Sequence, residues 1–87
     1  MDSTAAHPGE VLKQVLADRS MSHAEFARRM GVSAKHISEI INGKTGFSPQ
    51  FAVTMEKVLG GYPRAEYWIR ALAEYQAGVA VTQPPTT

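Results

Sequence analysis

Residues 22–44 read SHAEFARRMGVSAKHISEIINGK, and this stretch contains two short amphipathic segments that each begin at a serine. Ser22 stands where a helix N-cap belongs, and Glu25 three residues later completes the pattern of a capping box. A helix is therefore predicted over His23–Met30. Gly31 can adopt the positive φ that most side chains resist, so it predicts a sharp turn into the next helix.

The second segment predicts a helix that Ser33 caps and Gly43 ends. Three isoleucines recur on one face at helical spacing, namely Ile37, Ile40 and Ile41. The opposite face carries small and hydrogen-bonding side chains, which are Ala34, Lys35, Ser38, Glu39 and Asn42. Two short helices joined by a tight glycine turn, the second with a polar face, form the geometry that lets a helix enter the major groove of DNA.

Apolar periodicity predicts three further helices outside this stretch. The first runs from Pro8 to about Arg19, with an apolar stripe formed by Val11, Leu12, Val15 and Leu16. The fourth follows Ser48 and runs from Pro49 to about Leu59, with an inward face formed by Phe51, Ala52, Met55, Val58 and Leu59. Gly60–Gly61 ends it, and Pro63 opens a fifth helix from Arg64 to about Ala77. No β-type alternation appears in the sequence, so the predicted fold class is all-α.

A chain of 87 residues allows one small domain. We expect a flexible N-terminal arm over residues 1–6, the domain over 7–77 and a flexible tail over 78–87, because the two ends lack periodicity. Absence of cysteine excludes disulfides and thiolate metal sites. No apolar run approaches the roughly 18 to 20 residues that cross a bilayer, and the N-terminus lacks a signal-peptide pattern, so a cytoplasmic protein is expected.

The net charge is only +1, but the bases gather in the helical pair and its edges. Between residues 19 and 44 they are Arg19, Arg28, Arg29, Lys35 and Lys44, against Glu25 and Glu39. This basic patch coincides with the second helix of the pair, where neutralisation of phosphates would act. A solvated charged face is the alternative reading of the same pattern.

The quoted stretch resembles the helix-turn-helix of the XRE family of Cro-type repressors. With HPGE at residues 7–10 and GGYPRAEYW at 60–68, it is similar to the HigA-type antitoxin branch. The match covers roughly residues 7–75. The resemblance implies a five-helix, lambda-repressor-like DNA-binding domain whose helix-turn-helix is formed by helices 2 and 3. It also implies a homodimer on an inverted-repeat operator in double-stranded DNA, and a small ribonuclease toxin as a partner.

Contacts to DNA phosphates are expected where the two helices begin. Backbone N–H groups there, with the hydroxyls of Ser22 and Ser33, are placed to meet phosphates through the positive helix end. In the family the residue after the first serine is commonly a glutamine that bonds a phosphate. Here it is His23, whose ring can still donate. Asn42 and Lys44 match the family's NGK ending, which implies a grip on the backbone beyond the reading helix.

Base contacts are expected from the polar face of the second helix of the pair. Lys35 can donate to guanine O6 or N7, and Ala34 can pack on a thymine methyl group. Ser38 and Glu39 lie one turn further along. Glu39 can accept from cytosine N4 or, alternatively, pair with Lys35 within the helix. For His36, a DNA contact and a position flanking Ile40 both remain open.

The fifth helix concentrates large side chains that fit a dimer interface, namely Tyr67, Trp68, Leu72 and Tyr75. In the alternative, Trp68 and Leu72 pack back on the first and fourth helices. Both readings can hold for different faces of the helix.

Catalytic and metal functions find no support in the sequence. His7, His23 and His36 do not show metal-ligand spacing, and no cofactor is predicted. No Gly-x-Ser-x-Gly elbow or phosphate-cradling glycine loop is present, so the chain is not expected to be an enzyme.

The sequence therefore predicts a sequence-specific DNA-binding repressor, the antitoxin of a HigBA-type toxin–antitoxin system that represses its own operon as a dimer. Two alternatives remain: a phage or accessory XRE-family regulator without a toxin, and a protein-interaction module with the same fold.

Overall fold

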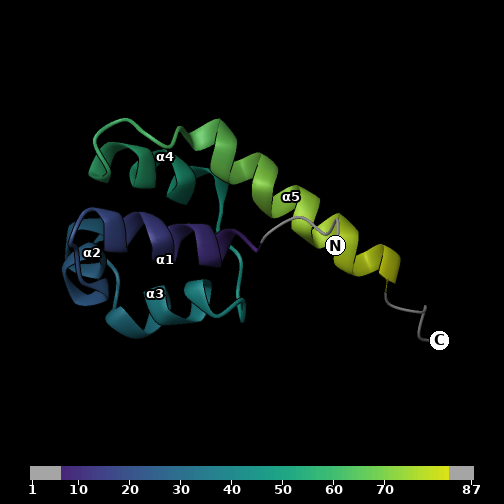
Figure 1. Ribbon diagram of the computed structural model, residues 1–87, viewed down its shortest axis with the longest axis horizontal. Coiled ribbons are helices and arrows are strands. Elements are labelled where there is room, and N and C mark those ends of the chain that lie inside the picture. The colour runs from purple at the N-terminus through teal and green to yellow at the C-terminus, as the bar shows by residue number, and fades with distance from the viewer. Residues whose placement is uncertain (1–6, 83–87) are drawn as a thin grey trace.

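The computed structural model describes residues 7–82, which form five α-helices and no strand (Figure 1). The helices are α1 (Pro8–Asp18), α2 (His23–Met30), α3 (Ala34–Ile41), α4 (Pro49–Val58) and α5 (Ala65–Thr82). The predicted all-α, five-helix fold is confirmed, with α2 and α3 as the helix-turn-helix. The predicted bounds of the first four helices agree with the structure to within one residue.

All five helices contribute to one hydrophobic core. Its buried side chains are Leu12, Leu16, Phe26, Ala27, Ile37, Ile40, Ile41, Ala52, Met55, Leu59, Ala65 and Trp68. No charged or polar side chain is buried in the described part of the chain. The predicted apolar faces of the first four helices therefore point inward, and this burial is the main stabilising contribution to such short helices.

Trp68 is a core residue. Its side chain is 0% exposed, and its buried indole Nε1 has no hydrogen-bond partner among residues 7–82. A side chain with no exposed surface cannot contact a second protein without rearrangement. Trp68 therefore leaves the set of dimer-interface candidates, and its packing back into the domain is the reading that holds.

The fifth helix differs from its prediction at both ends. It begins at Ala65, whose N–H donates to the carboxylate of Glu56 in α4 at 2.9 Å, so a side chain of another helix serves as its cap. It continues to Thr82, beyond the predicted end at Ala77, so residues 78–82 of the segment expected to be a flexible tail are helical. The predicted arm over residues 1–6 and the last tail residues, 83–87, lie outside the described residues.

Figure 1 shows α3 lying along α1 in the opposite direction, so that the end of α3 meets the start of α1. On the other side of α1 lie α4 and the first turns of α5, whose later turns extend away from the other helices. Across residues 7–82, no helix combines the length and the apolar character required to cross a membrane.

Candidate nucleic-acid interface

The two helices of the helix-turn-helix begin in the same way. The Ser22 hydroxyl accepts a hydrogen bond from the Glu25 N–H at 3.0 Å, and the Ser33 hydroxyl accepts one from the His36 N–H, also at 3.0 Å. Both serines have extended backbone geometry, with ψ of 161° and 155°. These are the N-caps that the sequence predicts, and each satisfies one otherwise unpaired N–H of the first turn.

The turn between the helices depends on Gly31, whose φ is +78°. The Val32 N–H donates to the Ala27 carbonyl at 3.0 Å and the Gly31 N–H to the Arg28 carbonyl at 3.2 Å. These two bonds form a Schellman motif, which closes α2 and redirects the chain toward the cap of α3. A Cβ added at Gly31 would meet no atom within 4 Å, so the positive φ alone demands glycine.

The charged side chains of α2 bind one another. Arg28 and Arg29 both donate to the Glu25 carboxylate, at 2.6 and 2.7 Å. The hydrogen bond from Arg28, followed by that from Arg29, lowers the pKa of Glu25 to about 2. The predicted capping box is therefore only half formed: the Ser22 bond is present, but the Glu25 carboxylate serves the arginines instead of the backbone at the start of the helix.

These ion pairs change the expected basic patch. Besides the two arginines of α2, Arg19 is also engaged, because it donates to the Tyr62 carbonyl at 2.8 Å. Within residues 7–82 the ion pairs are those of Glu25, so Lys35 and Lys44 remain without one. Both lysines are exposed, and they lie at the two ends of α3. Within the helix-turn-helix, the cationic side chains that remain free of an ion pair with a described residue are therefore those at the two ends of α3.

The outer face of α3 carries the predicted base-contact residues. Ala34 and Lys35 are exposed on its first turn, whereas Ser38 and Glu39 are half-buried one turn later. No ion pair joins Lys35 to Glu39, so the intrahelical alternative for Glu39 is absent. The Asn42 side-chain amide donates to the Ser38 hydroxyl at 3.5 Å, the outer limit for such a bond.

The two histidines of the helical pair occupy different environments. His23 is the first residue of α2 and is half-buried. The ring of His36 lies edge-on to that of Phe51 in α4, with centroids 5.7 Å apart and an interplanar angle of 83°. His36 therefore packs toward α4 with part of its ring exposed, a neighbour that the sequence reading did not identify.

The end of α3 repeats the design of the end of α2. Gly43 has a φ of +79°, and its N–H donates to the Ile40 carbonyl at 3.1 Å. The Lys44 N–H donates to the Glu39 carbonyl at 2.9 Å, which completes a second Schellman motif. Asn42 and Lys44, the residues expected to grip a DNA backbone, therefore stand on either side of a left-handed glycine.

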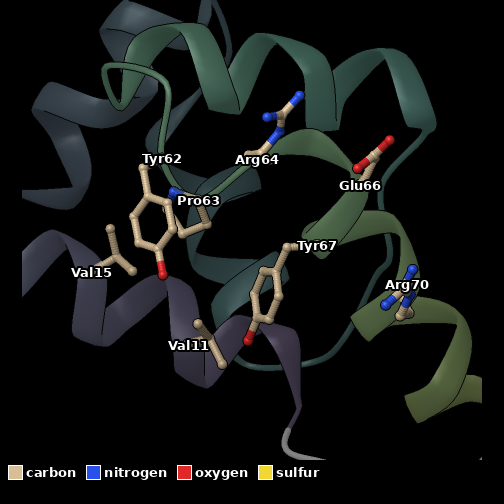
Figure 2. Close-up of a pocket in the computed structure, with 8 residues that line it drawn as sticks. All are labelled: Val11, Val15, Tyr62, Pro63, Arg64, Glu66, Tyr67 and Arg70. Carbon is tan, nitrogen blue, oxygen red and sulfur yellow. The ribbon is translucent and has the colours of Figure 1, made fainter.

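A groove of about 460 Å³ lies on the opposite side of α1 from α3, between α1 and the start of α5 (Figure 2). Its lining residues are Val11, Val15, Tyr62, Pro63, Arg64, Glu66, Tyr67 and Arg70. Tyr62 is 72% exposed and Tyr67 44% exposed, so two aromatic rings face solvent here.

Of the expected interface candidates, Tyr67 lies in this groove, whereas Leu72 and Tyr75 are half-buried further along α5. Sequence reasoning missed Tyr62, although its place in a Gly-Gly-Tyr-Pro loop indicates an exposed aromatic residue.

Comparison with known proteins agrees with this geometry. The model of the helix-turn-helix family HTH_3 matches residues 12–67, which contain α2, α3 and α4 entirely. Virulence-associated protein A of Dichelobacter nodosus is 36% identical over 70 residues, covering 79% of this chain and 68% of that protein.

Solved structures extend the likeness. A Nostoc punctiforme protein described as an antidote of a plasmid maintenance system is 32% identical, with a TM-score of 0.79 over 87% of this chain and 81% of that one. The Pseudomonas aeruginosa antitoxin HigA, solved with the higBA promoter, is 28% identical, with a TM-score of 0.78 over 87% of this chain and 82% of that one.

Proposed function

The chain belongs to the HTH_3 family of XRE-type helix-turn-helix proteins, and from this premise we propose that it is a sequence-specific DNA-binding transcriptional repressor. We further propose that it is the antitoxin of a HigBA-type toxin–antitoxin system and represses its own operon from the cytoplasm. The observation that carries the proposal is the outer face of α3, a helix capped by Ser33, whose charged groups form no ion pair within the described part of the chain.

Base reading is assigned to the exposed face of α3. Lys35 would donate to guanine O6 or N7 in the major groove, and Ala34 would pack on a thymine methyl group. Ser38 and Glu39 would read the next positions, Glu39 as an acceptor from cytosine N4. Because neither Lys35 nor Glu39 forms an ion pair with a residue of the range 7–82, a base contact would not require breaking one there.

Phosphate contacts are assigned to both sides of this face. The exposed serine caps Ser22 and Ser33 bring the first-turn N–H groups of α2 and α3 toward solvent, where the positive helix ends favour an anion. His23 would add a donor at the first helix, and Asn42 and Lys44 would hold the backbone at the exit of α3. His36 is kept as a further DNA contact through the exposed part of its ring.

Binding as a homodimer on an inverted repeat is part of the proposal. A small domain gains buried area from a second copy, and two reading helices related by a two-fold axis match a palindrome. Tyr67, with its exposed ring in the groove of Figure 2, is the best placed of the candidates, followed by Leu72 and Tyr75. The antitoxin role would add a small ribonuclease as a second partner.

The test is a mobility-shift titration at fixed salt with two duplexes, the promoter region immediately upstream of the protein's own coding sequence and a random duplex of equal length. A double change of Lys35→Ala and Ser38→Ala should lower the preference for the promoter about tenfold or more, since one good base contact contributes about 1–3 kcal/mol of discrimination. Lys57→Ala, which removes the same charge from the exposed surface of α4, is the control and should leave the preference unchanged.

Other outcomes select the alternatives. An unchanged preference in the double variant would remove α3 as the reader. If the wild-type protein shows no salt-dependent binding to any duplex, the protein-interaction module is the better description. Co-expression with a small basic protein encoded next to it tests the antitoxin role, and failure to form a complex or to protect cell growth would leave a regulator without a toxin.

A further inference from the structure

The side chain of His7 lies where three helices meet. Its Nδ1 accepts a hydrogen bond from the Gly9 N–H at 2.8 Å and so caps α1. Its ring lies edge-on to Tyr75 of α5, with centroids 4.7 Å apart and an interplanar angle of 75°. A Cβ added at Gly43 would collide with His7 Nε2 and lie 2.8 Å from Cδ2, so the imidazole rests directly against the turn that ends α3.

The neighbouring backbone explains why the ring reaches this turn. A Cβ at Gly9 would clash with the Ile40 carbonyl oxygen and lie 2.5 Å from that of Ile41. The first turn of α1 is thus packed backbone against backbone on the last turn of α3, with the positive end of one helix beside the negative end of the other. The N-cap of α1 and the C-terminal turn of α3 therefore pack against each other, and the His7 ring lies between them. We call this contact of His7, Gly9 and Gly43 the joint.

Capping alone does not account for a histidine at this position. Asparagine, aspartate and serine are the preferred N-caps, and each can accept the same bond from the Gly9 N–H. The imidazole is larger than these side chains, and the ring edge opposite its capping nitrogen rests against Gly43. Because Nδ1 accepts a bond, the proton of the neutral ring is on Nε2, the atom nearest the turn at Gly43.

We propose that His7 is a positioning residue for DNA binding: its ring holds the exit turn of α3 so that Asn42 and Lys44 meet the phosphate backbone. The inference rests on the proposed function. The turn's own backbone bonds run back to Ile40 and Glu39 within α3, so they fix its shape but not its place relative to α1. His7 supplies that second constraint from outside the helix.

The decisive variant is His7→Asn, which keeps a good capping acceptor but loses the ring that touches Gly43 and Tyr75. We expect it to bind the promoter duplex and the random duplex about three- to tenfold more weakly and by the same factor, because phosphate contacts carry no sequence information. The slope of log K against log salt should fall by about 0.9, the value of one lost phosphate contact. The ratio of the two affinities should not change.

Val58→Ala is the control for a general loss of stability, since Val58 packs against the core from α4, away from this joint. When the two proteins are compared at equal concentrations of folded protein, Val58→Ala should show the same slope of log K against log salt as the wild type. A double-mutant cycle with Lys44→Ala adds a second readout. If His7 acts through Lys44, the loss caused by Lys44→Ala should be smaller in the His7→Asn protein than in the wild type.

Each remaining outcome is decisive. If the wild type binds DNA and His7→Asn shows its full affinity and slope, the positioning role is wrong and the proposed function stands. If the variant also loses its preference for the promoter, His7 supports the whole fold and the positioning role is again wrong. If the wild type itself binds no duplex, the proposed function fails. If His7→Asn does not fold, His7→Ser, which also keeps a capping oxygen and lacks the ring, must show the same reduced slope, and a wild-type slope overturns the inference.

Discussion

The helices α2 and α3 have the same kind of N-cap and the same kind of C-terminal turn, but they differ in the ion pairing of their surface side chains. Each has eight residues, a serine N-cap with a 3.0 Å bond, and a left-handed glycine at its end. On α2 the charged side chains bind one another through Glu25, whereas on α3 Lys35 and Glu39 form no ion pair with any residue that the structure describes. Capping and turn chemistry therefore build both helices, and the charged groups of α3 that form no ion pair distinguish it as the helix that can bind an external partner.

The two helices also differ in the surroundings of their final glycines. A Cβ at Gly31 would find open space, but one at Gly43 would collide with His7. The end of α2 is thus a free turn, and the end of α3 is a packed joint with α1. Both glycines allow a left-handed turn, but only Gly43 also leaves room for a neighbouring side chain, the ring of His7.

The largest expected effects concern what the two helices have in common, their anchors in the core. Phe26 and Ile37 are both 0% exposed. Phe26→Ala should lower the free energy of unfolding by about 3–5 kcal/mol and Ile37→Ala by about 2–5 kcal/mol, from lost burial and the cavity left behind. Urea denaturation followed by circular dichroism measures both. A loss below about 1 kcal/mol for Ile37→Ala alone would mean that α3 is not an equal part of the cooperative unit.

The next largest effect separates the two glycines. Gly31→Ala should cost about 1–2 kcal/mol, the penalty of a left-handed conformation for a residue with a Cβ. Gly43→Ala carries the same penalty and should cost about 1–3 kcal/mol more, because the added carbon must displace the His7 ring. Equal melting temperatures for the two variants would contradict the packed joint at the end of α3.

The features of α2 and α3 that were predictable from sequence are local ones. Serine caps, glycine turns and the isoleucine spacing all act within one or two helical turns, so residues 22–44 contain the information for both helices. Glu25 shows the limit even at this range. Its carboxylate can reach either the start of α2 or the next turn, and the choice between capping and the two arginines depends on geometry that spacing does not specify.

The features that sequence reasoning missed or left open depend on contacts between distant segments. The sequence left two readings for Trp68, an interface and the core, and the choice follows from the packing of α5, which buries this side chain completely. The groove at Tyr62 and the joint at His7 likewise need the approach of elements far apart in the chain. The predicted helix ends at Ala77 because residues 78–87 lack periodicity, but α5 continues through Gly78 to Thr82, and a glycine inside a helix costs only about 1 kcal/mol relative to alanine.

A smaller effect tests whether the two serine caps are equivalent. Ser22→Ala and Ser33→Ala each remove one bond to a first-turn N–H and should each lower the free energy of unfolding by about 1 kcal/mol. Thermal melts of the two variants should therefore nearly coincide. A loss confined to one of them would show that the helices differ in local construction, contrary to the similarity of their caps.

The smallest expected effect concerns the ion pairs that only α2 has. Since Arg28 and Arg29 lower the pKa of Glu25 in the folded protein from 4.5 to about 2, the stabilisation they give is fully present above pH 4.5 and is lost as the pH falls to about 2. The two arginines are exposed and Glu25 is only half-buried, so the contribution is small, and it is best measured at Glu25 itself by NMR titration of the side-chain carboxyl carbon.

The expected midpoint in that titration is near pH 2, and Arg28→Ala should move it upward, because the hydrogen bond from Arg28 is the largest cause of the shift. Lys57→Ala, which removes a cation that forms no ion pair with Glu25, serves as the control and should leave the midpoint in place. A wild-type midpoint near 4.5 would mean that Glu25 does not hold the two arginines in solution. Arg28 and Arg29 would then be as available to phosphates as Lys35 and Lys44, and the contrast between α2 and α3 would disappear.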